Sequence, residues 1–369
     1  MTLSAPFISS CGVRIMEVSL LFGPETFSGA PFGDYYKFMK KLLVMNLQFY
    51  VNLLDKARKN ESIDIHKETS KLNNNNVCKM LMGRTCSEEN GEAGRVRDSV
   101  NKISGLLRKI LLANMLREPL KKLRISLFEK EITSASNEFN ELLERNLLEH
   151  EERPKDQQQA MDRRLISSLS RRKCRELFLA GTDTSSQTIQ WAMAEIINKP
   201  SIFERLRQET NLPRLLYLQA VVKETLRLHQ PAPLLIRKFE ERCKVGGFCI
   251  PENTTLVVNI YALMRDQNYW EDPDEFKPKR FLVSGREEEG ERALTFLPFG
   301  SGRRGCPAVN TGYIFVGNAF GVMVQCFDWR IKGYKVVNLQ DTVAGMTLTM
   351  AHPPSFTPLP RIDPLNLNL

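Results

Sequence analysis

The chain has 369 residues, of which 42% are hydrophobic and 26% charged, with 21 Gly and 19 Pro. These values are ordinary for a globular protein with a large core, and they exclude collagen-like, disordered and short disulfide-stapled chains. The formal net charge of +9 favours acidic partners, but the basic residues are spread too thinly to indicate nucleic-acid binding. The eight cysteines include no C-x-x-C pair, which predicts reduced thiols in a cytosolic setting.

The sequence predicts neither a membrane span nor a secretion signal. No run of about 18 apolar residues occurs, and residues 1–10 lack the basic start and long apolar core of a signal peptide. The segment at 107–125 combines leucines with basic residues, so we expect only peripheral contact with a membrane surface there.

Apolar residues recur at helical spacing through the first half of the chain. After an irregular start, this periodicity predicts helices at about 34–54, 94–115 and 124–151, the last two as an antiparallel pair. A polar stretch at 71–92, with four consecutive asparagines, is expected to separate the first helical region from that pair. A charged joint at 151–175 indicates a solvated linker.

The second half of the chain changes from helical to alternating periodicity and back. The predicted elements are helices at 171–198 and 213–229, short strands at 244–260, a polar meander at 268–290, a helix at 308–326 and a strand pair from Trp329. The first of these helices is expected to end at the Lys199-Pro200 step, because proline cannot donate a backbone hydrogen bond inside a helix.

A glycine-rich loop at 296–307 delivers one cysteine, Cys306, to the start of the last predicted helix. The positive end of a helix dipole and the free backbone N–H groups stabilise a thiolate, the form that ligates a metal. The glycines would let this loop approach a flat cofactor, and Arg304 could pair with an anionic substituent of that cofactor. The alternative is that Cys306 is a buried structural thiol.

The same loop also fits a nucleotide-binding pattern. Gly300 to Gly305 has the spacing G-x-G-x-x-G, between a strand-like segment at 293–297 and a helix. Two prolines weaken this alternative, because Pro298 interrupts the strand-to-loop junction and Pro307 removes an N–H from the helix start that would bind a pyrophosphate.

A polar run, Ala180 to Ser185, lies in the middle of the predicted helix at 171–198. Gly181 weakens the helix there, and threonine hydroxyl groups can bond backbone carbonyls, so the run predicts a groove that could hold a ligand. Asp183 and Thr184, an acid beside an alcohol, form a candidate proton relay to anything bound over this groove. The alternative is an exposed polar helix face.

Glu224 and Arg227 lie three residues apart, which places a carboxylate and a guanidinium on one helix face. Arg280, in a proline-containing loop at 276–281, could bind the same carboxylate and attach the meander to the helix. A pair at this spacing is usually a surface salt bridge, so the trio is structural only if it is buried.

In this order, the patterns resemble those of the cytochrome P450 family, the haem-thiolate monooxygenases. Four motifs match: the oxygen-activation motif at Ala180 to Ser185, the E-x-x-R pair Glu224 and Arg227, the P-x-R-F loop at Pro278 to Phe281, and the haem-binding loop at Phe299 to Cys306. The resemblance runs from Ala30 to about Arg361. Its stretch from Pro31 to Lys41 is similar to plant microsomal A-type enzymes of flavonoid and triterpenoid metabolism.

The resemblance implies a mainly α fold with a small β-rich part. It covers a single P450 domain over residues 1–369, with a partial N-terminal helical part at 1–170 and the motif-bearing part at 171–369. The family's N-terminal region has no counterpart before Ala30, and the joint at 151–175 is shortened, so we expect an incomplete version of the fold.

The resemblance also assigns roles to individual residues. Cys306 would be the axial ligand to the iron of haem b, and Gly181, Asp183 and Thr184 would form the catalytic groove that guides protons. The other haem-contacting residues would be Tyr36, Lys40, Arg237, Phe299, Gly302 and Arg304, with Glu224, Arg227 and Arg280 as a structural triad. Substrate contacts are expected from the helix start at 124–140, from a turn at Ala232 to Ile236 and from Met346 to Ala351. Tyr36 stands where the family usually has Trp, which predicts weakened haem retention.

The implied activity is insertion of one oxygen atom from O2 into a small hydrophobic plant metabolite. Electrons from NADPH would arrive through NADPH-cytochrome P450 reductase, docking on the basic side near Arg303. The family location is the cytosolic face of the endoplasmic reticulum membrane, with a cytosolic location as the alternative for a chain without an anchor. Two rival interpretations are a non-catalytic truncated remnant of such an enzyme and an NAD(P)-dependent dehydrogenase.

Overall fold

The computed structural model describes the parts of the chain that carry all four motifs. They are residues 47–82, 128–151, 171–209, 216–282, 294–333, 336–344 and 347–361, with single helical residues between 95 and 109. The predicted haem contacts Tyr36 and Lys40 lie outside the described residues.

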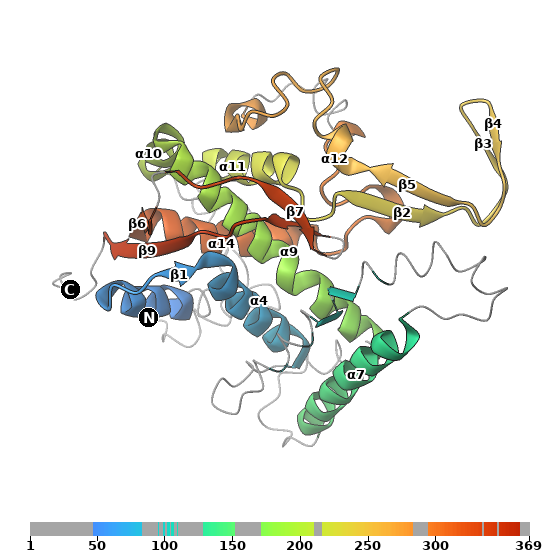
Figure 1. Ribbon diagram of the computed structural model, residues 1–369, viewed down its shortest axis with the longest axis horizontal. Helices are drawn as coiled ribbons and strands as arrows, with labels where there is room; N and C mark the ends of the chain where they lie inside the picture. Colours follow the sequence, from blue (N-terminus) through green and yellow to red (C-terminus); the bar gives the residue numbers. More distant parts are fainter. Residues whose placement is uncertain are drawn as a thin grey trace, which may run out of the picture.

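Helices make up most of the described chain (Figure 1). A helix at 47–58 is followed by α4 (Ile65–Met82), α7 (Glu129–Glu151), α9 (Arg171–Asn198), α10 (Pro200–Gln208), α11 (Leu216–Leu228), α12 (Ile260–Leu263) and α14 (Val309–Cys326). Two short 3₁₀ helices, η3 (Pro278–Phe281) and η4 (Gly302–Arg304), lie in the loops.

The strands form four small antiparallel sheets. They are β1 (Ile63–Asp64), β2 (Leu234–Lys238), β3 (Cys243–Val245), β4 (Phe248–Ile250), β5 (Thr255–Asn259), β6 (Phe327–Ile331), β7 (Asp341–Ala344), β8 (Thr347–Met350) and β9 (Ser355–Pro360). The sheet orders are β1-β9-β6, β2-β5, β3-β4 and β7-β8. The predicted mainly α fold with a small β-rich part is confirmed.

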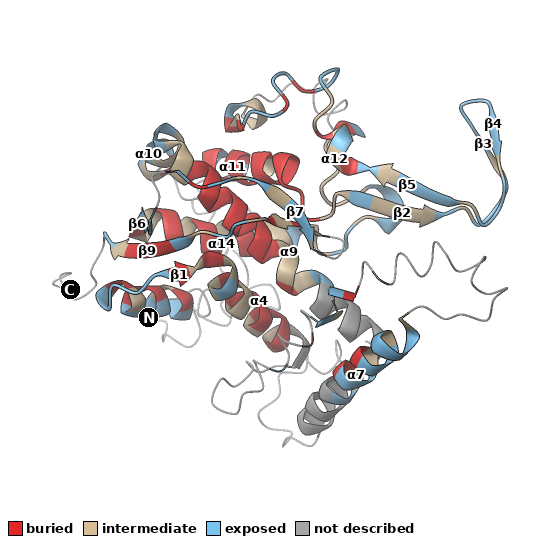
Figure 2. Cartoon of the chain, in the orientation of Figure 1, coloured by how far each residue is buried: buried red, intermediate tan, exposed pale blue. Residues whose placement is uncertain are grey.

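The long helix α9 lies at the centre of the described structure, in contact with α4, α11 and α14 (Figure 1). Its second half is buried, with Ile189, Trp191 and Met193 fully inaccessible to solvent. Figure 2 shows that the buried residues concentrate where α9, α11 and α14 lie together. This part of α9 reads as apolar in sequence because it is covered by other helices on several sides.

Helix boundaries in this region follow the predicted signals. The helix predicted at 171–198 is α9, and Pro200 occupies the first turn of α10, where its missing N–H has no intrahelical partner to lose. On α14, a Cβ atom at Gly317 or Gly321 would lie 3.8 or 3.6 Å from the Leu218 side chain of α11. Small residues therefore allow α14 to pack closely on α11.

The polar stretch predicted at 71–92 is not a separator over its described part, because residues 71–82 belong to α4. Asn73 is 0% exposed, and its Nδ2 donates to Ser186 Oγ of α9 at 2.8 Å. Thr182 Oγ1 in turn donates to Asn74 Oδ1 at 2.9 Å. Asparagine is a weak helix former, so hydrogen bonds to α9 outweigh local preference here.

The ribbon formed by β2 and β5 also departs from the prediction. The segment Ala232 to Ile236 was expected to be a turn, but its second half belongs to β2, which pairs with β5 from Leu234↔Asn259 to Lys238↔Thr255. The strands predicted at 244–260 are present as β3, β4 and β5. Gly246 and Gly247 both have positive φ, as a two-residue hairpin turn between β3 and β4 requires.

The antiparallel helix pair predicted before the central helix is supported by ion pairs. Lys109 Nζ lies 2.7 Å from Glu131 Oε2 on α7. Lys102, seven residues before Lys109, pairs with Glu138, seven residues after Glu131. The two pairings run in opposite sequence directions, as antiparallel helices require. Residues 152–170 of the charged joint lie outside the described residues.

One thiol contradicts the prediction of reduced cysteines, because Cys78 is disulfide-bonded. The cysteines Cys243, Cys249, Cys306 and Cys326 are free. None of the helices in the described part of the chain combines the length and hydrophobicity that crossing a bilayer requires.

Candidate active site

A cavity of about 270 Å³ lies between α9, α11, β2, the glycine-rich loop and the start of α14. Its lining side chains come from segments that are far apart in sequence, from α9 to the start of α14. Its lining residues are Ala180, Thr184, Ser185, Thr188, Val222, Leu226, Pro231, Ala232, Leu235, Arg237, Pro298, Phe299, Arg304, Cys306, Gly312, Tyr313 and Val316. Most of these are apolar, so the few polar groups among them define the chemistry of this first cavity.

Cys306 presents a free thiol to the first cavity. Its backbone N–H donates to Phe299 O at 2.8 Å, which closes the loop, and α14 begins three residues later at Val309. The cysteine is exposed, so the alternative of a buried structural thiol is wrong. An accessible sulfur near a helix start is suited to metal ligation.

Glycine is required at two turns of this loop. Gly300 has φ +71° and Gly302 has φ +67°, a region in which residues with a Cβ atom are strained. A Cβ atom at Gly300 would also lie 3.6 Å from Leu235 Cδ1 on the cavity wall. A Cβ atom at Gly302 would meet no neighbouring atom, so glycine is favoured at this position only because of its positive φ.

Two arginines line the first cavity without a carboxylate partner among the described residues. Arg237, on β2, donates through Nη2 to Arg304 O at 3.1 Å and through Nη1 to Ile236 O at 2.9 Å. Arg304 follows the glycine turn in η4. Two unpaired guanidinium groups beside an apolar cavity are suited to a ligand that carries two anionic groups.

The polar run of α9 presents Thr184 to the first cavity. Thr184 Oγ1 donates to Ala180 O at 2.7 Å, and Thr188 Oγ1 donates to Thr184 O at 3.0 Å. Both hydroxyl groups bond carbonyls one turn back, as predicted for this run, whereas the helix itself continues without interruption from Arg171 to Asn198. The structure therefore places an alcohol at the cavity wall opposite the cysteine loop.

Asp183 and Gly181 do not line the first cavity. Asp183 hydrogen-bonds His66 of α4 and Gln187 of α9. A Cβ atom at Gly181 would lie 3.4 Å from Val77 Cγ2, so this glycine allows α4 to approach α9. The acid and the alcohol of the predicted relay thus lie on different faces of the same helix.

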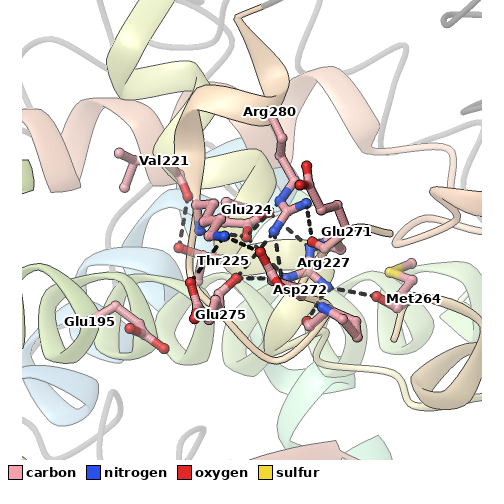
Figure 3. A network of polar contacts seen from close by, with 12 residues as sticks. Glu195, Val221, Glu224, Thr225, Arg227, Met264, Glu271, Asp272, Glu275 and Arg280 are labelled. Atoms are coloured by element: carbon pink, nitrogen blue, oxygen red, sulfur yellow. Dashed lines mark hydrogen bonds and ion pairs between the residues drawn. The ribbon is translucent and has the colours of Figure 1, made fainter. Parts of the chain in front are cut away.

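The structure brings the predicted triad together, and it is buried (Figure 3). Arg227 donates to both carboxylate oxygens of Glu224, at 2.9 and 3.0 Å, and both side chains are 0% exposed. Arg280 Nε donates to Glu224 Oε1 at 3.1 Å. The meander is attached to α11 in this way, and a surface salt bridge is excluded.

Arg227 also binds backbone carbonyl groups, which the sequence did not predict. Its Nη1 donates to Met264 O and Pro273 O, both at 2.7 Å, and its Nη2 donates to Glu275 O at 3.2 Å (Figure 3). Helix α11, which contributes Val222 and Leu226 to the first cavity, is thus connected to the meander by charge-assisted hydrogen bonds.

Sequence reasoning did not identify Tyr313, whose ring lies in the first cavity and contacts Phe299 with centroids 5.2 Å apart. Burial raises the pKa of Tyr313 to about 12, so its hydroxyl stays neutral. The available signal was its position, because Tyr313 lies near the start of the helix that follows the cysteine loop.

The dinucleotide alternative is not supported by the fold around the loop. Residues 294–295 are helical instead of extended, so the described part of the segment predicted as a strand is not one. All strand pairs in the described part of the chain are antiparallel, whereas a dinucleotide-binding unit needs a parallel sheet with crossover helices.

The first cavity fits a haem group on four observations. It holds an accessible thiol, two unpaired arginines, a loop with glycines at positive φ, and mostly apolar walls. A thiolate can ligate the iron, guanidinium groups can bind two propionates, and apolar walls can cover a flat macrocycle. Gly302, Phe299, Arg237, Arg304 and Cys306 are all placed in or next to this cavity.

Comparison with known proteins gives consistent results. A family model described as cytochrome P450 matches residues 26–357. Cytochrome P450 705A22 of Arabidopsis thaliana is 51% identical over 407 aligned positions, which cover 97% of this chain and 79% of the relative. Cytochrome P450 705A20 of the same plant is 51% identical, with coverage of 98% and 79%. A more distant relative, 3,9-dihydroxypterocarpan 6A-monooxygenase of Glycine max, is 32% identical, with coverage of 92% and 77%.

The alignment with the 705A22 protein has 407 positions, more than the 369 residues of this chain. That relative therefore has positions inside the matched region that have no counterpart here. The match nevertheless extends over nearly the whole chain, and the thiol loop, polar helix run and buried triad occur together in the fold. This chain belongs to the cytochrome P450 family of monooxygenases.

Proposed function

We propose that this chain is a haem-thiolate monooxygenase that inserts one oxygen atom from O2 into a hydrophobic plant secondary metabolite of flavonoid-like or triterpenoid-like structure. The observation that carries the proposal is the accessible Cys306 thiol in a cavity with two unpaired arginines. When bound, a thiolate-ligated haem supplies activation of O2 for attack on C–H bonds.

The residues of the chain would bind and orient the haem. Cys306 holds the iron, and Arg237 and Arg304 bind propionates at the rim of the first cavity. The family resemblance assigns Tyr36 and Lys40 to the same groups. Phe299 and Tyr313 pack edge to face and cover the cysteine side of the cavity.

Thr184 is the residue best placed to handle protons at the reacting centre. Its hydroxyl is the polar group that α9 contributes to the wall together with Ser185 and Thr188. A hydroxyl can accept one proton while donating another, so it can orient water without carrying charge. Asp183, the preceding residue, would supply protons to this position.

The substrate class is argued from the walls of the first cavity. Leu226, Leu235, Val222 and Val316 give it an apolar surface, which favours a lipophilic molecule. Ala232 and Leu235 come from a segment predicted to contact substrate. The name of the Glycine max relative specifies a dihydroxypterocarpan, which supports an aromatic plant metabolite as a first substrate to test.

We further propose that NADPH-cytochrome P450 reductase delivers the electrons at the cytosolic face of the endoplasmic reticulum membrane. Arg303 and Arg304 are exposed beside the thiol loop, where an acidic electron donor could dock close to the cavity. The net charge of +9 favours such an encounter.

The carbon monoxide spectrum of the reduced protein tests the proposal. We expect a red-shifted Soret band, because a thiolate is the axial ligand, and loss of that band in Cys306→Ala. Cys249→Ala is the matched control, because this thiol is also free and exposed but lies on β4, away from the first cavity. A wild-type protein without haem, or with a band typical of neutral ligation, would establish the rival interpretation of a non-catalytic remnant.

A further inference from the structure

A second cavity, of about 310 Å³, lies on another face of α9 from the first. Most of its lining residues carry polar groups, and they come mainly from β1, α4, α9 and β8. The lining residues are Asp64, His66, Gly105, Asp183, Gln187, Gln190, Thr347, Thr349, Met350 and Pro353. On α9 these are residues 183, 187 and 190, whereas the first cavity uses 180, 184, 185 and 188. The middle of α9 is thus a wall shared by two cavities.

Asp183 is held in the second cavity by bonds to both carboxylate oxygens. Oδ1 lies 2.8 Å from His66 Nε2, and Oδ2 accepts a hydrogen bond from Gln187 Nε2 at 2.6 Å. The side chains of Asp183 and His66 are 17% and 28% exposed, so the pair lies between the interior and solvent. An imidazole in this position can exchange protons with water through its other ring nitrogen.

Two buried polar atoms in this cavity have no partner among the described residues. They are Oε1 of Gln187, which is 2% exposed, and Nε2 of Gln190, which is 3% exposed. Buried polar atoms in native proteins are nearly always hydrogen-bonded to protein or to ordered water. One water takes up about 30 Å³ of liquid, so the cavity has room for several. Both residues line the cavity, so the lack of described partners for these two atoms indicates that ordered water lies in this region.

The charged and titratable groups that face His66 are few. Asp183 of α9 and Asp64 of β1 are the described carboxylates that line the cavity. Asp64 Oδ1 accepts the backbone N–H of Lys67 at 3.3 Å, which orients it towards the start of α4. The hydroxyls of Thr347 and Thr349 complete the polar wall from β8.

We propose that the second cavity is the proton-uptake site of this enzyme and that His66 is a positioning residue of the reaction. The inference rests on the proposed function, because insertion of one oxygen atom and reduction of the other to water consume one O2, two electrons and two protons. The electrons come from the reductase, and the protons must enter from solvent.

In this inference, water in the second cavity gives a proton to one ring nitrogen of His66, and Nε2 gives its proton to Asp183 Oδ1. The carboxyl group passes that proton to water beside Thr184, the next residue, whose hydroxyl lines the first cavity. This transfer leaves His66 neutral with its proton on Nδ1, so a ring flip or proton exchange with water restores the Nε2–H form before the next transfer. Bulk solvent replaces the proton that the first water gave up, so no charge accumulates. Consecutive helix residues point about 100° apart, which is why one run of α9 can serve both cavities.

The test compares His66→Gln with Lys67→Gln. Glutamine can keep a hydrogen bond to Asp183 but cannot exchange a proton in the neutral range. Lys67 is exposed on the same turn of α4 and does not line the cavity, so Lys67→Gln is the matched control. For His66→Gln we expect kcat about tenfold lower with KM unchanged. This is less than the roughly 10²–10⁴-fold contribution of a group that acts directly on the reacting atoms, because His66 acts through Asp183.

The pH profile separates proton exchange from a structural role. Turnover of His66→Gln should rise as the pH falls, because protons then come from solvent directly, and more reducing equivalents should be lost as hydrogen peroxide. Wild type and Lys67→Gln should change little over the same range. A His66→Gln enzyme with normal turnover and a wild-type pH profile overturns the proposal.

A measurement without turnover tests the pair itself. The chain has four histidines, so selective ¹⁵N labelling gives few resonances. Asp183→Asn should move the Nε2 resonance of His66 and leave that of His352 in place, with or without haem. An unmoved His66 resonance overturns the proposal. Absence of the thiolate spectrum in wild type overturns the proposed function instead, so the two failures are distinguishable.

Discussion

Arg227 makes five hydrogen bonds in the core, one for each N–H donor of its guanidinium group. Two go to Glu224, two go to backbone carbonyl groups of the meander, and one goes to the carbonyl group of Met264 at the end of α12. A lysine could not reproduce this planar pattern, because its ammonium group is a point charge with three donors. The E-x-x-R spacing therefore has a structural explanation at the level of single atoms.

Removing this arginine should be strongly destabilising. Arg227→Ala leaves the Glu224 carboxylate buried with Arg280 alone, and breaking a buried ion pair on one side costs about 3–5 kcal/mol. Urea denaturation would measure the shift in midpoint. The control is Lys59→Ala, because the Lys59–Asp55 pair is exposed and its loss should leave the midpoint unchanged. A midpoint for Arg227→Ala close to that of this control would contradict the prediction.

His229 makes stability depend on pH. Burial lowers the pKa of His229, despite its bond to Glu195 at 2.8 Å, and the ring is stacked on Trp191 with centroids 3.9 Å apart. The folded state therefore binds fewer protons than the unfolded state below the ordinary histidine value of 6.5. The stabilising contribution is present above pH 6.5 and is lost as the pH falls, by up to about 1.4 kcal/mol per pH unit.

Thermal unfolding at pH 7.5 and 5.5 measures this effect. The loss of stability between the two values should be smaller in His229→Asn, which cannot take up a proton on unfolding. Lys59→Ala is the control, because the pairing with Asp55 raises the pKa of this exposed lysine further above both pH values, so its loss should leave the pH dependence at its wild-type slope. Equal slopes in wild type and His229→Asn would exclude His229 as the source.

At the scale of elements, the glycine-rich loop is fixed by its backbone before any ligand contact. The N–H groups of Gly300, Gly305 and Cys306 donate to Leu297, Gly302 and Phe299, respectively, at 2.8–3.0 Å. Two tight turns and one bond that closes the loop set the position of the sulfur within ten residues. The loop is therefore a short self-bonded unit, in which Gly300 and Gly302 act through their positive φ.

Substitution of one glycine should separate backbone strain from function. Gly300→Ala and Gly333→Ala both place a Cβ atom at positive φ, at a cost of about 1–2 kcal/mol each. Only Gly300 borders the cavity wall, through Leu235. We expect similar losses of melting temperature but loss of the thiolate carbon monoxide band in Gly300→Ala alone. A normal band in Gly300→Ala would mean that the loop tolerates the shift.

The sequence predicted some elements better than others, for physical reasons. The helix at 171–198 was predicted with its observed bounds, because a proline stop and a long apolar run are local signals. Asn73 to Asn76 were misassigned because their helix depends on hydrogen bonds to Thr182 and Ser186, more than 100 residues away. β2 was misassigned because prolines on both sides of Ala232 indicated a turn, whereas pairing with β5 decides the strand.

The site was predictable in its chemistry but not in its division into two cavities. Cys306, Arg237, Arg304 and Thr184 meet in one cavity, as the family resemblance implied. The sequence could indicate which face of the helix carries Asp183. It could not indicate that His66 is the partner of Asp183, because the two residues are 117 positions apart. A lone histidine in a polar stretch gives no signal until the fold places it against an acid.

At the scale of the whole molecule, the described structure surrounds one helix. α9 contacts α4, α11 and α14, and both cavities open along it. The β2–β5 ribbon contributes Leu235 and Arg237 to the first cavity, whereas β8 contributes Thr347 and Thr349 to the second. The packing of α9 against its neighbours therefore also sets the positions of the side chains that line both cavities.

The four consecutive residues Thr182 to Ser185 have an evolutionary consequence. Thr182 bonds α4, Asp183 faces one cavity, and Thr184 and Ser185 face the other. Deleting or inserting one codon in this turn would rotate every later side chain by about 100° and exchange the chemistry of the two walls. Point substitutions can tune each wall separately, but the length of this turn is fixed by the geometry of the helix.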